Sequence, residues 1–337
     1  MFLAATMLDA CAGGGGTSTP DPPAPPWVAE VGRDHPLAGR IWRPAQARFV
    51  EPGALVEALA GARYVLLGEK HDNADHHRLQ AWLLARLIAR GRAPAVAFEM
   101  FASDQQPALE AYLAAHPGDA AGLGAAVGWD KTGWPDWARY RPIAQAALDA
   151  DAPILAANLS RATIQSVAKE GVAALGAARV RALGLERAMP AALAARMHAQ
   201  IVASHCDQLP ESMIGPMTTV MRARDAHMAG VLIRGARMAG RDGAVLITGK
   251  GHARTDYGVP FHLRRLAPGE AAASLALVEV AEDEADPAAY AARFGAQALP
   301  FDFVWFTARA QRKEPCEEFA EQLRRAKERH LREREAE

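Results

Sequence analysis

The 337-residue sequence predicts an α/β protein, with a mainly parallel sheet flanked by helices and a smaller all-helical insertion domain. Six short apolar runs have the length of buried strands, and the stretches between the early runs have the 3.6-residue periodicity of helices. Strands and helices that alternate in this way favour a parallel sheet covered on both faces. A long middle segment shows helical periodicity only, which predicts the insertion.

The elements follow in chain order. The predicted strands are Arg63–Leu67, Ala95–Phe98, Pro153–Ala157, Ala244–Thr248, Ser274–Val280 and Phe301–Phe306. The predicted helices between the early strands are Asp75–Arg90, Gln105–Ala115 and Trp137–Asp149. Asn73 is expected to cap the first of these helices. His76 and His77, near its start, are expected either to be partly exposed or to support the site residues, and metal ligation by either is a weaker alternative. Pro135 or Asp136 is expected to lie near the start of the third.

These elements divide the chain into parts. Residues 27–160 and 242–315 are expected to form the α/β core, residues 161–241 a helical subdomain, and residues 316–337 a charged C-terminal helix. Residues 1–26 are predicted to be a signal remnant followed by a flexible tether that is rich in Gly, Ser, Thr and Pro. Leu8-Asp9-Ala10-Cys11 resembles the lipobox of bacterial lipoproteins, so Cys11 is the expected lipidation site. The alternative is a leader that carries an incidental cysteine.

Composition excludes several classes of protein. Lys and Arg number 38 against 39 Asp and Glu, which leaves no cationic excess for nucleic-acid binding. No run reaches the roughly 18 apolar residues of a membrane-spanning helix, so only a lipid anchor is expected to hold the chain at a membrane. Three widely spaced cysteines predict no disulfide framework, and Cys206 and Cys316 are expected only to pack.

Polar or ionisable groups follow four successive predicted strands. Because ligands of parallel sheets bind beyond the carboxyl ends of the strands, these groups are expected to line one cleft. The glycines Gly68 and Gly249 are expected to let the chain turn sharply there and to bring backbone N–H groups toward a ligand. In strand order the polar groups are Glu69 and His71, then Glu99, then Asn158 and Arg161, and finally His252, Arg254, Asp256 and Tyr257.

Two Gly-x-x-His sequences, Gly68–His71 and Gly249–His252, stand out among these strand ends. With Glu69 and Glu99 they supply two imidazoles and two carboxylates. Such a set could perform general acid/base catalysis with all four side chains, or hold a divalent metal through His71, His252 and Glu69. The alternative is structural: the four side chains hydrogen-bond one another and close the edge of the sheet.

The sequence contains two apolar clusters, and each could either pack in a core or bind a ligand. Met213, Met217, Met221 and Met228 fall at helical spacing, which favours core packing but could also line an apolar pocket. Trp129, Trp134 and Trp137 lie close together with Tyr140, and such a loop could pack or stack on a flat ligand.

The order of these motifs resembles a known family, the ChaN-like haem-binding lipoproteins, which belong with the Tiki/TraB and erythromycin-esterase-like proteins. The motifs that carry the resemblance are Gly68–Asn73, Glu99–Phe101, Asp104–Pro107, Gly133–Trp137, Asn158-Leu159, His205-Cys206, Arg224–Ala226, Gly249–His252 and Asp256–Pro260.

The resemblance implies a bacterial haem-binding lipoprotein of iron or haem uptake, dimeric and anchored through Cys11 to the outer membrane, facing the periplasm. An outer-membrane haem or iron receptor system is its implied partner. A tyrosine is the implied haem ligand, with Tyr140 and Tyr257 as the preferred candidates. Arg139, Arg141 or Arg254 is the implied partner of the haem carboxylates. Asn158, Arg161, Arg224, Asp225 and Asp256 are expected to line the cleft.

The superfamily also implies an alternative function. In that reading the protein is a metal-dependent peptidase or esterase that uses the paired Gly-x-x-His motifs and the glutamates. A third interpretation is a lipoprotein scaffold whose ionisable cluster is structural.

Overall fold

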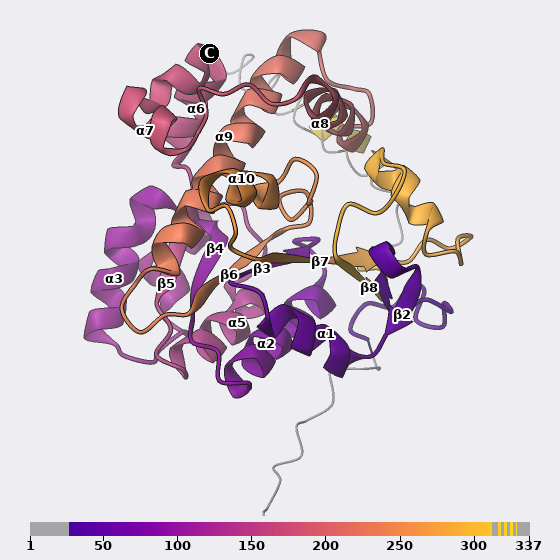
Figure 1. The fold of residues 1–337 in the computed structure, drawn as a ribbon, viewed down its shortest axis with the longest axis horizontal. Coiled ribbons are helices and arrows are strands. Elements are labelled where there is room, and N and C mark those ends of the chain that lie inside the picture. Colours follow the sequence, from indigo (N-terminus) through magenta and orange to yellow (C-terminus); the bar gives the residue numbers. More distant parts are fainter. Residues whose placement is uncertain (1–26, 312–315, 318–319, 322–323, 326–327, 329–337) are drawn as a thin grey trace, which may run out of the picture.

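The computed structural model describes residues 27–311 and, nearer the C-terminus, residues 316–317, 320–321, 324–325 and 328. In this part of the chain, strands form one sheet in the order β2-β1-β8-β7-β3-β6-β4-β5 (Figure 1). The strands from β3 to β8 are parallel, whereas β1 is antiparallel to both β2 and β8 at one edge. The predicted fold class is confirmed. The predicted lipidation site and tether, and most of the predicted C-terminal helix, lie outside the described residues.

Each of the six predicted strands overlaps an observed one. The parallel strands are β3 (Tyr64–Glu69), β4 (Pro94–Ala102), β5 (Ile154–Asn158), β6 (Gly243–Gly249), β7 (Ala272–Glu279) and β8 (Phe303–Thr307). The strands β1 (Ile41–Arg43) and β2 (Arg48–Val50) were not predicted, because three residues are too few to show a periodicity. The structure also extends β3 through Glu69 and β4 through Glu99, so both glutamates lie within strands rather than after them.

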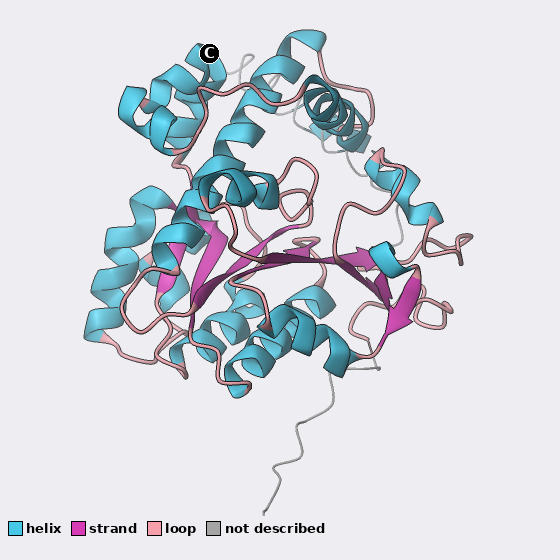
Figure 2. Cartoon of the chain, viewed as in Figure 1, coloured by secondary structure: helices cyan, strands magenta, loops and turns pink. Residues whose placement is uncertain are grey.

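Helices cover both faces of the sheet (Figure 2). One face packs against α1 (Pro52–Ala60), α2 (Ala74–Ala89) and α5 (Trp137–Leu148), and the other against α10 (Val259–Leu266) and the end of α9. Side chains of β3 alternate between the two cores: Val65 and Leu67 contact the first, Tyr64 and Leu66 the second. Alongside lie α3 (Gln106–Ala115) and the short α4 (Leu123–Ala126).

The predicted cap of α2 is present, and α5 begins where expected, next to Asp136. The Asn73 side chain accepts a hydrogen bond from the backbone of Asp75 at the start of α2, and Asp136 does the same for Ala138 at the start of α5.

The chain between β5 and β6 forms helices. They are α6 (Arg161–Glu170), α7 (Ala177–Ala182), α8 (Ala191–Ser204) and α9 (Glu211–Gly235). The first half of α9 packs among α6 and α8, and its second half lies against β4, β5 and β6, so this one helix joins the insertion to the sheet (Figure 1). No helix in the described part of the chain is long and apolar enough to cross a membrane.

A disulfide links Cys206 to Cys316, with their Cα atoms 5.5 Å apart. The prediction that these two cysteines only pack is therefore wrong. Cys206 lies in the turn between α8 and α9, with a positive φ of 57°. Two single cysteines separated by 110 residues give no sequence signal that the chain brings them together.

Candidate functional site

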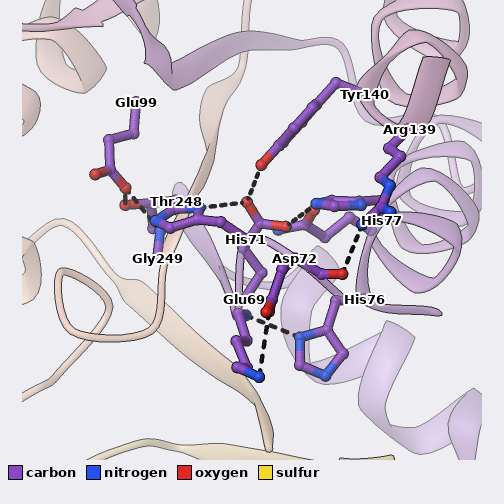
Figure 3. Close-up of polar contacts among 12 residues, drawn as sticks. Glu69, His71, Asp72, His76, His77, Glu99, Arg139, Tyr140, Thr248 and Gly249 are labelled. Carbon is purple, nitrogen blue, oxygen red and sulfur yellow. Dashed lines mark hydrogen bonds and ion pairs between the residues drawn. The ribbon is translucent and has the colours of Figure 1, made fainter. Parts of the chain in front are cut away.

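Glu69, at the end of β3, is the centre of a buried polar cluster (Figure 3). Its side chain accepts hydrogen bonds from His71 Nδ1 at 2.9 Å and from the Tyr140 hydroxyl at 3.0 Å, and His77 Nε2 lies 2.6 Å from its other oxygen. Burial alone would raise the pKa of Glu69, but His77 and His71 outweigh burial and lower the pKa to about 2. Glu69 is therefore a fixed carboxylate and a poor general base.

Glu99, within β4, accepts hydrogen bonds from two neighbouring elements, β6 and α9. One carboxylate oxygen accepts hydrogen bonds from the Thr248 hydroxyl and the Gly249 backbone N–H, both at 2.7 Å. The other accepts from Arg224 of α9 at 2.6 Å. Burial opposes the charge, but His252 and Arg224 hold the pKa of Glu99 well below its usual range.

His252 lies between two buried carboxylates. Its Nδ1 is 2.5 Å from Asp225 of α9, and its Nε2 is 3.3 Å from Glu99. Burial alone would lower the pKa of His252, but the charges of Glu99 and Asp225 outweigh it and raise the pKa to about 9. Burial raises the pKa of Asp225. The insertion helix α9 thus supplies Arg224 and Asp225 to a site otherwise built from strand ends.

Of the two motif histidines, His71 is the more exposed, with 32% of its side chain accessible against 5% for His252. Its ring packs edge-on against Trp134, with the ring centroids 4.7 Å apart. Burial would lower the pKa of His71, but the hydrogen bond to Glu69 and the charge of Glu99 raise it. The side chain can therefore donate or accept a proton at the surface of the cluster.

Gly68 and Gly249 matter because the space beside each has no room for a side chain. Both have ordinary φ values, so the expectation of a glycine-specific turn is wrong. A Cβ on Gly249 would lie 2.9 Å from His71 Nε2, and a Cβ on Gly68 would lie 2.9 Å from Lys250 Cα. The Gly249 N–H donates to Glu99 rather than pointing at a ligand cavity.

The predicted metal ligands do not form a metal site. In the described residues, no group of three or more His, Cys, Asp and Glu side chains is arranged to hold a metal ion. His71 binds Glu69 through Nδ1, whereas His252 directs both ring nitrogens at Asp225 and Glu99. Carboxylates within the cluster already engage Nδ1 of His71 and both ring nitrogens of His252.

The predicted haem-contacting residues are buried and already partnered. Tyr140 and Tyr257 are 0% and 2% exposed, and burial raises the pKa of both phenols, which disfavours a phenolate. Arg254 is 1% exposed and donates to both Asp256 oxygens and to the Phe294 carbonyl. Tyr257 packs in one apolar cluster with Ile201, Met217 and Met221. The role of Tyr140, Tyr257 and Arg254 as haem contacts stays a prediction.

A cavity of about 400 Å³ lies between α6, α8 and α9. We call it the methionine pocket. Its wall is mostly apolar, and His205 at the end of α8 and Arg224 are its basic members. The residues that line it include Ile164, Ala168, Ile201, His205, Met213, Met217, Met221 and Arg224. Met228 packs in the core instead. The methionine series therefore does both things that the sequence allowed: Met213, Met217 and Met221 line a pocket, and Met228 packs in the core.

A second cavity of about 580 Å³, the strand-end cleft, adjoins the methionine pocket. Its lining includes Lys131, Trp134, Asn158, Arg161 and Ile164. Ile164 lines both cavities, and Arg224 of the pocket donates to the Asn158 side chain of the cleft at 2.9 Å. The strand-end residues Asn158 and Arg161 thus lie beside a cavity, as the cleft expected from the parallel sheet requires.

The sequence left open whether His76 and His77 are partly exposed or support the site residues. They are 0% and 1% exposed, so the first alternative is wrong. His76 accepts from the Lys70 backbone N–H, and His77 supports Glu69. The signal was available: His76 is in helical phase with Leu79, Leu83 and Leu87, which places it on the buried stripe of α2.

Comparisons with known proteins identify related chains. The family model for haem-binding uptake proteins of the Tiki superfamily, ChaN, matches residues 55–263. A solved structure of ChaN from Campylobacter jejuni, described as showing cofacial haem binding, is 22% identical with a TM-score of 0.58, covering 79% of this chain and 95% of that one. At this identity the likeness shows a shared fold.

Two further structures match more weakly. An erythromycin esterase in its open conformation is 15% identical with a TM-score of 0.39, over 67% of this chain and 72% of that one. The type III effector HopBA1 is 14% identical with a TM-score of 0.42, over 75% of this chain and 91% of that one. A search of curated proteins gave no match.

Proposed function

The chain belongs to the ChaN family of haem-binding uptake proteins in the Tiki superfamily, and from this we propose that it binds haem in the methionine pocket as a lipoprotein of the bacterial cell envelope. The single observation that carries the location is the pocket itself: an apolar cavity in the insertion with His205 on its wall. The polar cluster around Glu69 and Glu99 then serves as a rigid base for α9, which forms one side of the pocket.

The residues of the methionine pocket fit a haem. Its volume of about 400 Å³ is within the range of about 300–1,000 Å³ usual for small-molecule sites. Methionine side chains adapt to flat aromatic surfaces, and their thioether sulfurs make favourable contacts with ring edges. Three methionines one helical turn apart on α9 supply such a surface.

We propose His205, rather than a tyrosine, as the iron ligand. No tyrosine is among the residues that line the pocket. His205 Nδ1 lies 2.7 Å from the Ile201 carbonyl oxygen, which can only accept, so Nδ1 carries the proton. A histidine whose Nδ1–H is held by a backbone carbonyl is oriented in the way that metal-binding histidines commonly are.

Location and assembly are part of the same proposal. The Cys206–Cys316 disulfide supports an oxidising compartment such as the periplasm, where Cys11 would anchor the chain to the outer membrane. Met213 lines the pocket and is 48% exposed, which supports a dimer in which a second copy covers this apolar side chain. An outer-membrane haem or iron receptor is the partner that such a protein would serve.

Haem titration tests this function. Purified protein titrated with ferric haem is expected to develop a Soret band at micromolar haem. His205→Ala is expected to shift the band and weaken binding at least about tenfold, since it removes the iron ligand. His198→Ala, on the exposed side of α8, is the matched control and should bind as the wild type does. No spectral change with wild-type protein would overturn the function. A band altered by Tyr140→Phe or Tyr257→Phe but not by His205→Ala would return the ligand to tyrosine.

A hydrolase is a second candidate, favoured by the partly exposed His71 oriented by Glu69 beside Trp134 of the cleft. In this function His71 rather than Glu69 exchanges the proton, because the lowered pKa of Glu69 makes it a weak base. Turnover of an ester or peptide panel that is lost in His71→Ala, with haem binding unchanged, would establish it. Equal turnover by the wild type and His71→Ala would remove it.

A further inference from the structure

This inference rests on the proposed haem binding and concerns the orientation of the ligand. We propose that Arg161 and Lys131 hold the two carboxylates of haem in the strand-end cleft while the macrocycle occupies the methionine pocket. The ligand would therefore enter with its carboxylate edge toward the ends of β4 and β5.

The two cavities lie side by side along one helix and share Ile164 in their walls. Arg161 is the first residue of α6 and lines the cleft, Ile164 lines both cavities, and Ala168 lines the pocket. These residues are spaced i, i+3 and i+7, so they form one stripe on the face of the helix. At a rise of about 1.5 Å per residue the stripe extends for about 10 Å, and its character changes from cationic to apolar along that length.

The two cationic side chains of the strand-end cleft are available to bind an anion. Arg161 and Lys131 make no hydrogen bond or ion pair through their side chains with any described residue, and Arg161 is exposed. Arg224, by contrast, is already engaged by Glu99 and Asn158. Asp104 also lines the cleft, so the cleft carries two cations against one carboxylate, a balance that favours an anionic group.

Haem has the matching distribution of properties. Its macrocycle is apolar and its two carboxylates leave from one edge, so a single molecule can satisfy an apolar pocket and a cationic cleft together. A guanidinium binds a carboxylate through two parallel hydrogen bonds, which fixes orientation as well as adding affinity.

Esterified haem separates this inference from the proposed function. Wild-type protein and the double variant Arg161→Gln/Lys131→Gln are titrated with haem and with haem dimethyl ester, in the same cosolvent. The wild type is expected to bind haem about tenfold more tightly than the ester, and the double variant to bind the two alike. Arg181→Gln, an exposed cation on α7, is the control and should keep the wild-type preference.

Each outcome has one meaning. Tight haem binding that neither esterification nor the double variant weakens would overturn the carboxylate anchor and leave the proposed function standing. No binding of either ligand by the wild type would overturn the proposed function. If the double variant fails to fold, as judged by circular dichroism, the wild-type ratio between haem and ester still decides: a ratio near one refutes the anchor, and a clear preference for haem supports it.

Discussion

At the scale of single residues, the imidazole of His252 is held in its charged form by two carboxylates that are themselves out of reach of water. A charge in such a place is tolerated only while its partners are present. The same holds for Glu69, whose partners come from α2, from α5 and from the turn that follows its own strand. Stability is therefore linked to the protonation of both groups.

Stability should fall as the pH rises through 9. The pKa of His252 is about 9 in the folded chain and about 6.5 when unfolded, so its contribution is fully present below pH 6.5 and lost above 9. The difference corresponds to about 3 kcal/mol. Urea unfolding at intervals between pH 6 and 10 measures it, and His252→Gln should flatten this dependence. Identical pH profiles for the two proteins would contradict the assignment.

For Glu69 the pH dependence of stability has the opposite sign. The pKa of Glu69 is about 2 in the folded chain against 4.5 in its ordinary state, so its contribution is present above pH 4.5 and is lost as the pH falls toward 2.

The sequence predicted which residues carry charge at the strand ends but not how they pair. Glu69, His71, Glu99 and His252 follow from the alternation of strands and glycines. Their partners do not, because Asp225 and Arg224 come from a helix of the insertion whose docking onto the sheet has no local signal. For the same reason Arg254 looked available for a ligand, although the fold buries it against Asp256.

At the scale of elements, the close approach of β3 to the turn that follows β6 sets the geometry of the cluster. Gly68 leaves no room for a side chain: an added Cβ would meet Lys250 Cα and Ala253 Cβ, both at 2.9 Å. Neither atom can rotate away, because one is backbone and the other is fixed to it.

Gly68→Ala should therefore shift the end of β3 and destabilise the protein by about 1–3 kcal/mol, the usual cost of overpacking. Gly251→Ala is the matched control, since a Cβ there meets nothing within 4 Å. Denaturant midpoints for both variants measure the effect. Equal denaturant midpoints for Gly68→Ala and Gly251→Ala would show that the end of β3 accommodates the added methyl group without loss of stability.

Strand positions were predictable because β3 to β8 are buried on both faces and so form apolar runs. The order of the strands was not, since a parallel sheet pairs residues far apart in the chain. The edge hairpin of β1 and β2 was missed because it is short and half exposed.

At the scale of the whole molecule, the Cys206–Cys316 disulfide ties the C-terminal segment to the turn that carries His205. A crosslink across 110 residues removes much of the freedom of the unfolded chain. The sequence could not show this link, because nothing near either cysteine indicates the other.

Reduction should lower the stability of the wild type by about 2–4 kcal/mol. The double variant Cys206→Ser/Cys316→Ser should unfold at the same lower temperature whether or not dithiothreitol is present. Thermal unfolding with and without the reductant makes the comparison. A wild type that reductant leaves unchanged would mean that the crosslink does not constrain the chain.

The position of β3 has a consequence for how the molecule is made. Tyr64 pairs with Ala244 on one side and with Ala272 on the other, so both hydrogen-bonding neighbours of the central strand are synthesised long after it. A ribosome-bound chain cannot complete this sheet until nearly all of its residues have emerged, and non-local pairing of this kind is slow. The topology thus leaves the central strand without either of its sheet neighbours for most of translation.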